Sequence, residues 1–191
     1  MGVTTVAAEA PGMDAGTSAT AQMLQGGLNA DGDYVYDTGN VQEVKLNNKS
    51  ILIGQNSQLY ALYNGIKLKD QALLDPNTWF TIENLHFQSG SGDLKPGSET
   101  QLANLAEILN AYPNVRVKVG GYTDDTGNPD SNMKLSNLRA QTAKLKLLEM
   151  GISGDRVEAE GYGPLFPVCE ANDTDECKAQ NRRIDVRLLS F

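Results

Sequence analysis

Apolar residues recur with two different periods along the chain, and their order predicts its strands and helices. Four segments alternate apolar and polar residues as strands do: residues 79–87, 115–123, 156–163 and 183–189. Two segments between them carry apolar residues at helical spacing: Leu102, Leu105, Ile108 and Leu109, then Leu135, Leu138, Leu145 and Leu148. Pro96 stands where the first helix would begin, and Gly151 closes the second. With a short helix-prone piece at residues 175–183, the order is β-α-β-α-β-(α)-β. This order predicts one sheet with helices on one side, an α/β (α+β two-layer) sandwich.

The region before residue 78 predicts a smaller structured unit. The runs VQEVKL and KSILIG alternate around two asparagines, which is a hairpin signature. A helix with Asn56 or Ser57 as its N-cap follows, and its apolar face is formed by Leu59, Leu62 and Tyr63. Because this unit is too small to hold a core alone, we expect it to pack against the larger domain.

The chain therefore divides into three parts. Residues 1–33 are small, polar and aperiodic, which predicts a flexible N-terminal segment. Residues 34–77 form the hairpin-plus-helix extension, and residues 78–191 form the main domain.

Composition and charge mainly exclude classes of function. The 191 residues carry a formal net charge of −8, which argues against a protein that binds nucleic-acid phosphates or anionic lipid surfaces. The sequence has no run of about 18 apolar residues that would span a membrane as a helix. A secretory signal is not visible either, and Met1-Gly2 is compatible with an artificial start that stands in place of a removed signal.

Two cysteines, Cys169 and Cys177, lie eight residues apart in the loop-like segment PVCEANDTDEC. They suit a local disulfide, which would place the protein in an oxidising compartment; two free thiols are the alternative. Two cysteines and the distant His86 do not match a familiar zinc spacing, so we predict no metal of this kind and no cofactor.

The residues favour a protein that is not an enzyme. His86 is the single histidine and lies in a strand-like run, with neither a Gly-x-Ser-x-Gly turn nor a phosphate-binding loop in the sequence. Asp124 and Asp125 are candidates for a catalytic carboxylate pair, but adjacent residues on a strand or turn diverge.

A calcium-binding module is a further alternative. The stretch NADGDYVYD places oxygen-bearing side chains at odd spacing: Asn29, Asp31, Asp33 and Asp37. It lacks the glycine at the sixth position and the final glutamate of a calcium loop, which favours a coincidental polar stretch.

The polar loop and helix from Gly121 to Leu145, GYTDDTGNPDSNMKLSNLRAQTAKL, raise the main functional question. Taken alone, two adjacent aspartates are typical of a turn, Arg139 of a solvated helix face, and Asn132 of a helix cap. The alternatives are a cation site, an active site, or a receptor for a group with both a positive and a negative end.

Four motifs in order resemble the OmpA-like C-terminal domain, the peptidoglycan-binding module also found in Pal lipoproteins and flagellar motor stators. They are LHFQSGSGDLKPGS, VKVGGYTDDTG, NMKLSNLRAQ and GYGPLFPV followed by AQNRRIDV. The resemblance covers residues 78–191 and implies a mixed sheet with helices on one face.

The resemblance also implies a ligand, the diaminopimelate of a peptidoglycan stem peptide, whose side chain ends in an ammonium and a carboxylate on one carbon. Asp124 matches the family's carboxylate for the ammonium, and Arg139 matches its guanidinium for the carboxylate. Arginine suits this role because its planar fork binds a carboxylate bidentately, which lysine cannot do. The remaining residues implied for the ligand-binding site are Thr123, Asn132, Ser89, Gly90, Arg182 and Asn181, of which Arg182 completes the charged wall and Asn181 orders Arg182.

The sequence departs from the family pattern at three places. Tyr122 stands where the family often has histidine, and Gln88 where it often has aspartate. The cysteine loop replaces a shorter polar segment and is expected to alter the rim of the cleft.

We therefore expect a periplasmic, non-enzymatic protein, associated with the outer membrane of a Gram-negative bacterium, that binds peptidoglycan non-covalently and anchors the outer membrane or an envelope complex to the wall. The alternative is an envelope interaction protein with the same fold and another partner, with no nucleic acid among its partners.

Overall fold

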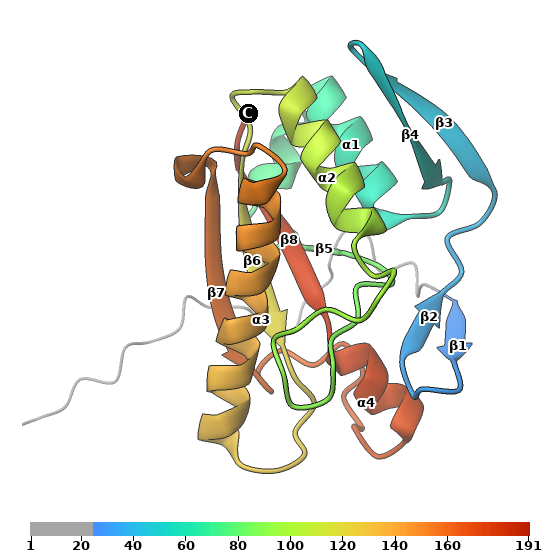
Figure 1. Cartoon of the computed structure of the whole chain (residues 1–191), viewed down its shortest axis with the longest axis vertical. Coiled ribbons are helices and arrows are strands. Elements are labelled where there is room, and N and C mark those ends of the chain that lie inside the picture. The colour runs from blue at the N-terminus through green and yellow to red at the C-terminus, as the bar shows by residue number, and fades with distance from the viewer. Residues whose placement is uncertain (1–24) are drawn as a thin grey trace, which may run out of the picture.

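The computed structural model describes residues 25–191, so that most of the N-terminal segment predicted to be flexible lies outside the described residues. Within this range, no helix is long and apolar enough to cross a membrane. The chain runs from two short hairpins through α1 into a four-stranded sheet with its helices (Figure 1).

The sheet is mixed and has the strand order β5-β8-β6-β7. Its strands are β5 (Phe80–Thr81), β6 (Arg116–Tyr122), β7 (Val157–Gly163) and β8 (Ile184–Ser190). β6 runs parallel to β7, which requires a crossover connection, whereas β8 is antiparallel to both β6 and β5. The crossover is α3 (Pro129–Glu149), which returns the chain alongside the strands that it joins.

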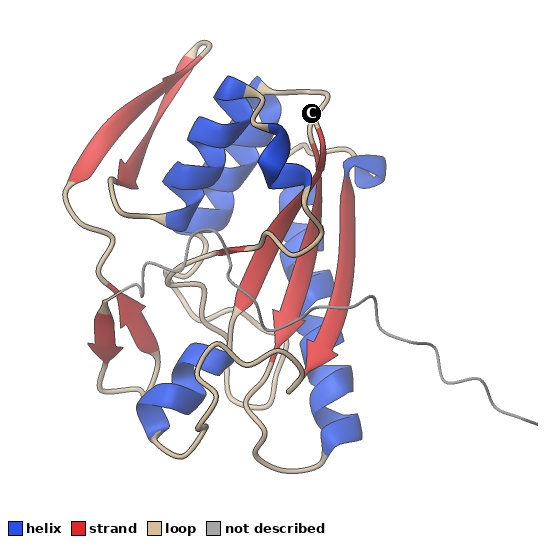
Figure 2. Ribbon diagram, turned by 180° about the vertical axis from the view of Figure 1, so that it is seen from behind, coloured by secondary structure: helices blue, strands red, loops and turns tan. Residues whose placement is uncertain are grey.

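Helices pack on one face of the sheet (Figure 2). α1 (Gln58–Leu68) and α2 (Thr100–Ala111) join α3 there. Alternate residues of β6 and β8 point into a single core with these helices, among them Val117, Val119, Ile184, Val186 and Leu188. The predicted α+β two-layer class, with helices on one face of a mixed sheet, is confirmed.

α3 is present as predicted, but two of the four leucines that mark it lie on its exposed side. Leu138 and Leu145 are more than half exposed, and the helix buries Ser136, Arg139, Ala140, Ala143 and Leu147 instead. The reason is a close approach between α3 and the sheet at two glycines: a Cβ on Gly121 would lie 2.1 Å from the Ser136 carbonyl oxygen, and one on Gly161 2.1 Å from the Asn137 nitrogen. Leucine is too large for this contact, so Ser136 and Ala140 take the positions that face Gly121.

The first predicted strand ends earlier than expected, and the first predicted helix begins later. Only Phe80–Thr81 of residues 79–87 pair as a strand, because Glu83 turns toward α1 and Asn84 adopts a left-handed φ of 59°. α2 begins at Thr100 rather than near Pro96, after an irregular loop that bridges back at Phe87 and Leu94.

The extension packs against the main domain as expected. β3 (Val41–Leu46) and β4 (Lys49–Gly54) form the predicted hairpin, and Ser57 is the N-cap of α1. The buried carboxylate of Glu83 accepts hydrogen bonds from the Ser57 hydroxyl and the Gln58 backbone N–H, which fixes the start of α1 on the main domain. Apolar residues of the extension share one core with the sheet and α2.

The last residues of the segment expected to be flexible include a short strand. β1 (Gly26–Leu28) pairs antiparallel with β2 (Tyr34–Tyr36), and Asn29 organises the turn between them by accepting hydrogen bonds from the backbone N–H groups of Asp31 and Asp33. The short helix α4 (Asp175–Asn181) and the 3₁₀ segments Gln71–Leu74 and Gly154–Arg156 complete the described elements.

Candidate functional site

A cavity of about 350 Å³ lies at the end of β6, where the polar loop leads into α3. Four parts of the chain line it: this loop with the first turns of α3, residues 85–95, the end of α4 (Asp175–Asn181) with Arg182, and the β1–β2 turn. Both signs of charge meet there: the lining includes Asp31, Asp33 and Asp124 as well as Lys95, Arg139 and Arg182.

Arg139 reaches the cavity from α3 and is only 7% exposed. Its Nε donates a hydrogen bond to the Ser91 carbonyl at 3.0 Å, its Nη2 donates one to the Gln88 carbonyl at 3.3 Å, and the guanidinium lies 5.2 Å from the Phe87 ring centre. Within residues 25–191, its Nη1 takes part in no hydrogen bond or ion pair. Burial lowers the pKa of Arg139 to about 10, and the charge of Arg182 acts in the same direction while Asp124 opposes it. The guanidinium therefore stays charged at neutral pH and keeps donor capacity for a ligand.

Asp124 lines the same cavity as Arg139 and pairs with Arg182. Its Oδ2 is 2.8 Å from Nη1 of Arg182, and its Oδ1 accepts a hydrogen bond from the Thr126 backbone N–H. Burial raises the pKa of Asp124, but the hydrogen bonds from Arg182 and Thr126 outweigh it and hold the pKa below its ordinary value. The carboxylate is therefore ionised over the whole neutral range.

Thr123 and Asn132 frame this loop. Thr123 is 6% exposed, and its Oγ1 has no hydrogen-bond partner among the described residues although its residue lines the cavity. A buried hydroxyl without a partner is costly, so this atom is a candidate ligand contact. Asn132 donates its side-chain N–H groups to the carbonyls of Asp124 and Thr126, which holds the loop in place.

Ser89 and Gly90 form the opposite rim. Gly90 has a φ of 65°, and a side chain added there would meet nothing within 4 Å, so the turn is open toward solvent. The same turn provides the carbonyls that hold Arg139. The predicted ligand residues Ser89 and Gly90 therefore lie beside the guanidinium of Arg139.

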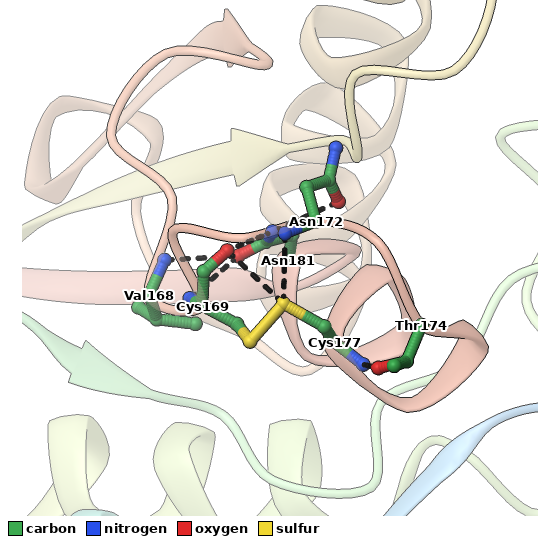
Figure 3. Close-up of a disulfide and its surroundings, with 6 residues drawn as sticks. All are labelled: Val168, Cys169, Asn172, Thr174, Cys177 and Asn181. Carbon is green, nitrogen blue, oxygen red and sulfur yellow. Dashed lines mark hydrogen bonds between the residues drawn. A yellow bond between two sulfur atoms is a disulfide. The ribbon is translucent and has the colours of Figure 1, made fainter.

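Asn181 is the predicted site residue that the structure places elsewhere. It is 1% exposed and lines no part of the cavity; its Oδ1 accepts from the backbone N–H groups of Val168 and Cys169, and its Nδ2 donates to the Cys169 carbonyl (Figure 3). The Cys169–Cys177 disulfide, with a Cα–Cα distance of 5.3 Å, confirms the predicted pairing and ties the same loop to α4. Asn181 and the disulfide therefore fix the helix end that precedes Arg182 rather than contacting a ligand.

Several cavity residues escaped the sequence reasoning. Lys95 and His86 line the cavity from the irregular loop, and Asp31, Gly32 and Asp33 line it from the β1–β2 turn. No local pattern in the sequence marks Lys95, and the pattern around Asp31 and Asp33 indicates only a candidate calcium loop.

The calcium interpretation of that turn is not supported. Asn29 is used within the turn, and Asp33 forms a 2.6 Å ion pair with Lys95. In the described part of the chain, no group of three or more His, Cys, Asp or Glu side chains is placed to hold a metal ion.

Comparison with known proteins matches this site to a family. The sequence model of the OmpA family matches residues 86–182, about half of the chain. The protein belongs to the OmpA family. Those residues include both members of the predicted central pair, Asp124 and Arg139.

Two curated relatives carry informative names. The chain is 42% identical over 105 residues to Probable lipoprotein YiaD of Escherichia coli, covering 55% of this chain and 48% of that protein. It is 35% identical over 100 residues to Peptidoglycan-binding protein ArfA of Mycobacterium tuberculosis, covering 52% of this chain and 30% of that protein. The match thus spans half or less of the curated relatives' length, and neither name is that of an enzyme.

A solved structure shows the same fold. The peptidoglycan-associated lipoprotein from Burkholderia pseudomallei aligns with a TM-score of 0.51 and 26% identity, over 61% of this chain and 98% of that one.

Proposed function

We propose that this protein binds peptidoglycan non-covalently through the diaminopimelate of its stem peptide and anchors an envelope component to the cell wall. The observation that carries the proposal is that Asp124 and Arg139 both line one cavity of about 350 Å³. A ligand whose side chain ends in an ammonium and a carboxylate fits such a pair.

Arg139 would bind the ligand carboxylate. It is held from behind by two backbone carbonyls, which fixes the plane of the guanidinium and leaves Nη1 for a ligand. A charge-assisted hydrogen bond from a fixed, desolvated arginine is stronger than one from a solvated side chain. The Thr123 hydroxyl is available as an additional contact at the same end of β6.

Asp124 would bind the ammonium. Its present partner Arg182 is partly exposed and is attached through a 2.8 Å ion pair. An incoming ammonium would share the carboxylate with Arg182 or displace it, so that the aspartate remains paired with and without ligand and its charge is not left buried alone.

The relatives' names support the envelope assignment. One relative is named a lipoprotein, another a peptidoglycan-binding protein, and the aligned structure is that of a peptidoglycan-associated lipoprotein. The disulfide is typical of an oxidising compartment. We therefore propose a periplasmic location in association with the outer membrane of a Gram-negative bacterium.

Calorimetric titration tests the proposal. The full chain is titrated with a diaminopimelate-containing stem peptide and with the lysine-containing counterpart, which lacks the terminal carboxylate. We expect binding of the first peptide, weaker binding of the second, and a loss on the order of 2–5 kcal/mol in Arg139→Ala and Asp124→Ala.

Arg139→Lys is the matched control because it keeps the charge but not the fork, and we expect it to restore only part of the affinity. Folded wild-type protein that binds neither peptide, or a folded Arg139→Ala variant that binds as tightly as wild type, would refute the proposal. The first of these results would favour an envelope interaction protein with another partner.

A further inference from the structure

One wall of the cavity comes from outside the family-matched residues. Asp31, Gly32, Asp33 and Tyr34 of the β1–β2 turn line the cavity, whereas the OmpA family match begins at residue 86. The turn lies beside α4 in both views of the fold (Figures 1 and 2), so it reaches the cleft from outside the family-matched residues.

This turn is fastened to the residues of the proposed site. The Gly32 carbonyl accepts a hydrogen bond of 3.0 Å from Nη2 of Arg182, the same guanidinium that pairs with Asp124. Asp33 and Lys95 form a 2.6 Å ion pair with only 15% and 23% of their side chains exposed. β2 is held in turn by the Asn84 side chain, which accepts a hydrogen bond from the Tyr36 backbone N–H. The turn is thus a built part of the cleft.

The three carboxylates of the cavity differ in their partners. Asp124 is paired with Arg182, and Asp33 is paired with Lys95. Asp31 forms no ion pair with any residue from 25 to 191, and only its backbone N–H is engaged, with Asn29. A cation that enters the cavity therefore meets one carboxylate whose charge is not already balanced.

We propose that the β1–β2 turn is a functional wall of the binding cleft and that Asp31 attracts the ammonium of the bound zwitterion together with Asp124. Asp31 then makes the site selective for ligands that carry this ammonium. The inference rests on the proposed function, because it concerns the same ligand and the same cavity.

The test compares two peptides that differ only in the ammonium. One is the diaminopimelate stem peptide; the other carries 2-aminopimelate, which keeps the terminal carboxylate and lacks the ammonium. Both are titrated at low ionic strength into the full chain and into Asp31→Asn, which changes the charge and removes no hydrogen bond described for that side chain. Asp37→Asn is the control, because it changes net charge equally on the same hairpin, does not line the cavity, and keeps the oxygen that accepts from Gly39.

We expect Asp31→Asn to lower the affinity for the diaminopimelate peptide about two- to fivefold, as for loss of an exposed ion pair, and to leave the affinity for the aminopimelate peptide unchanged. Asp37→Asn should change neither. Equal affinity of Asp31→Asn and wild type for the diaminopimelate peptide, or an equal loss for both peptides, would overturn this inference while Arg139→Ala still reports on the proposed function. Wild-type protein that binds neither peptide would contradict both this inference and the proposed function.

Discussion

Single residues of this protein owe their roles to what surrounds them. Arg139 on a bare helix would be a solvated charge, but burial, two carbonyl acceptors and the Phe87 ring make it a fixed donor in a cavity. Asp124 is a turn residue and a site residue at once, since its Oδ1 closes the turn and its Oδ2 faces Arg182. Residue type therefore predicted the chemistry of both side chains, and the environment decides how strongly they act.

Glu83 gives a prediction at this scale that concerns stability and pH. The carboxylate is fully buried, and burial raises its pKa despite the hydrogen bonds from Gln58 and Ser57. A carboxyl group with a raised folded-state pKa binds its proton more tightly in the folded state. The ionised group therefore costs stability at neutral pH, and this cost disappears as pH falls through the folded pKa toward the unfolded one.

Urea unfolding of wild type and Glu83→Gln at several pH values measures this effect, because glutamine does not titrate. We expect the free energy of unfolding of wild type, relative to that of the variant, to rise as the pH is lowered from 8 to 5. A difference in unfolding free energy that stays constant or falls as the pH is lowered would contradict a raised pKa for Glu83.

At the scale of elements, the site depends on how closely α3 lies on the sheet. The contact is made by glycines of β6 and β7 against the backbone of α3 near Ser136, one turn before Arg139. The Ser136 hydroxyl adds a hydrogen bond from the Gly163 backbone N–H at 2.8 Å. On the other side, the disulfide and Asn181 fix the end of α4 before Arg182. Arg139 and Arg182, two of the cationic residues that line the cavity, are thus positioned by separate, rigid connections.

Gly161→Ala tests the close approach. A Cβ at this position would lie 2.1 Å from the Asn137 backbone nitrogen, which cannot move without shifting α3. We expect a loss of about 1–3 kcal/mol in the free energy of unfolding, as for other overpacked sites, with weaker ligand binding because Arg139 is displaced.

Gly154→Ala is the matched control for this prediction, since a Cβ there would meet no atom closer than 3.8 Å. Chemical denaturation of both variants gives the comparison, and equal stability of the two would show that the helix contact tolerates a methyl group.

At the scale of the whole molecule, the extension and the main domain form one structure. Ile53, Leu59, Leu62 and Ile66 from the extension are at most 1% exposed and belong to the same core as the sheet and α2. Burying a side chain of this size contributes about 1.5–3 kcal/mol each relative to exposure. The extension therefore stabilises the domain beneath it, and the β1–β2 turn that precedes it lines the cavity.

Removal of residues 1–77 tests this dependence. We expect the remaining chain to unfold at a temperature lower by more than about 10 °C and to bind a hydrophobic dye, because the apolar faces of α2 and β5 lose their cover. Differential scanning calorimetry makes the comparison with the full chain, and an unchanged melting temperature would contradict a shared core.

The sequence by itself determined the order of the elements, the hairpin at its two asparagines, the helix capped by Ser57, the disulfide pair and the residue types of the central pair, because each follows from a local period or a short motif. Only the tertiary structure decided three further matters. Where α3 meets the sheet most closely its buried face holds the small residues Ser136 and Ala140, since the distance between helix and sheet is set by glycines on strands that are remote in sequence. Asn181 supports the cysteine loop instead of the cavity, since its partners lie nine to thirteen residues earlier in the chain. The β1–β2 turn became a wall of the cavity because Gly32 meets Arg182, 150 residues away, and no pattern of neighbours along the chain encodes a contact over that separation.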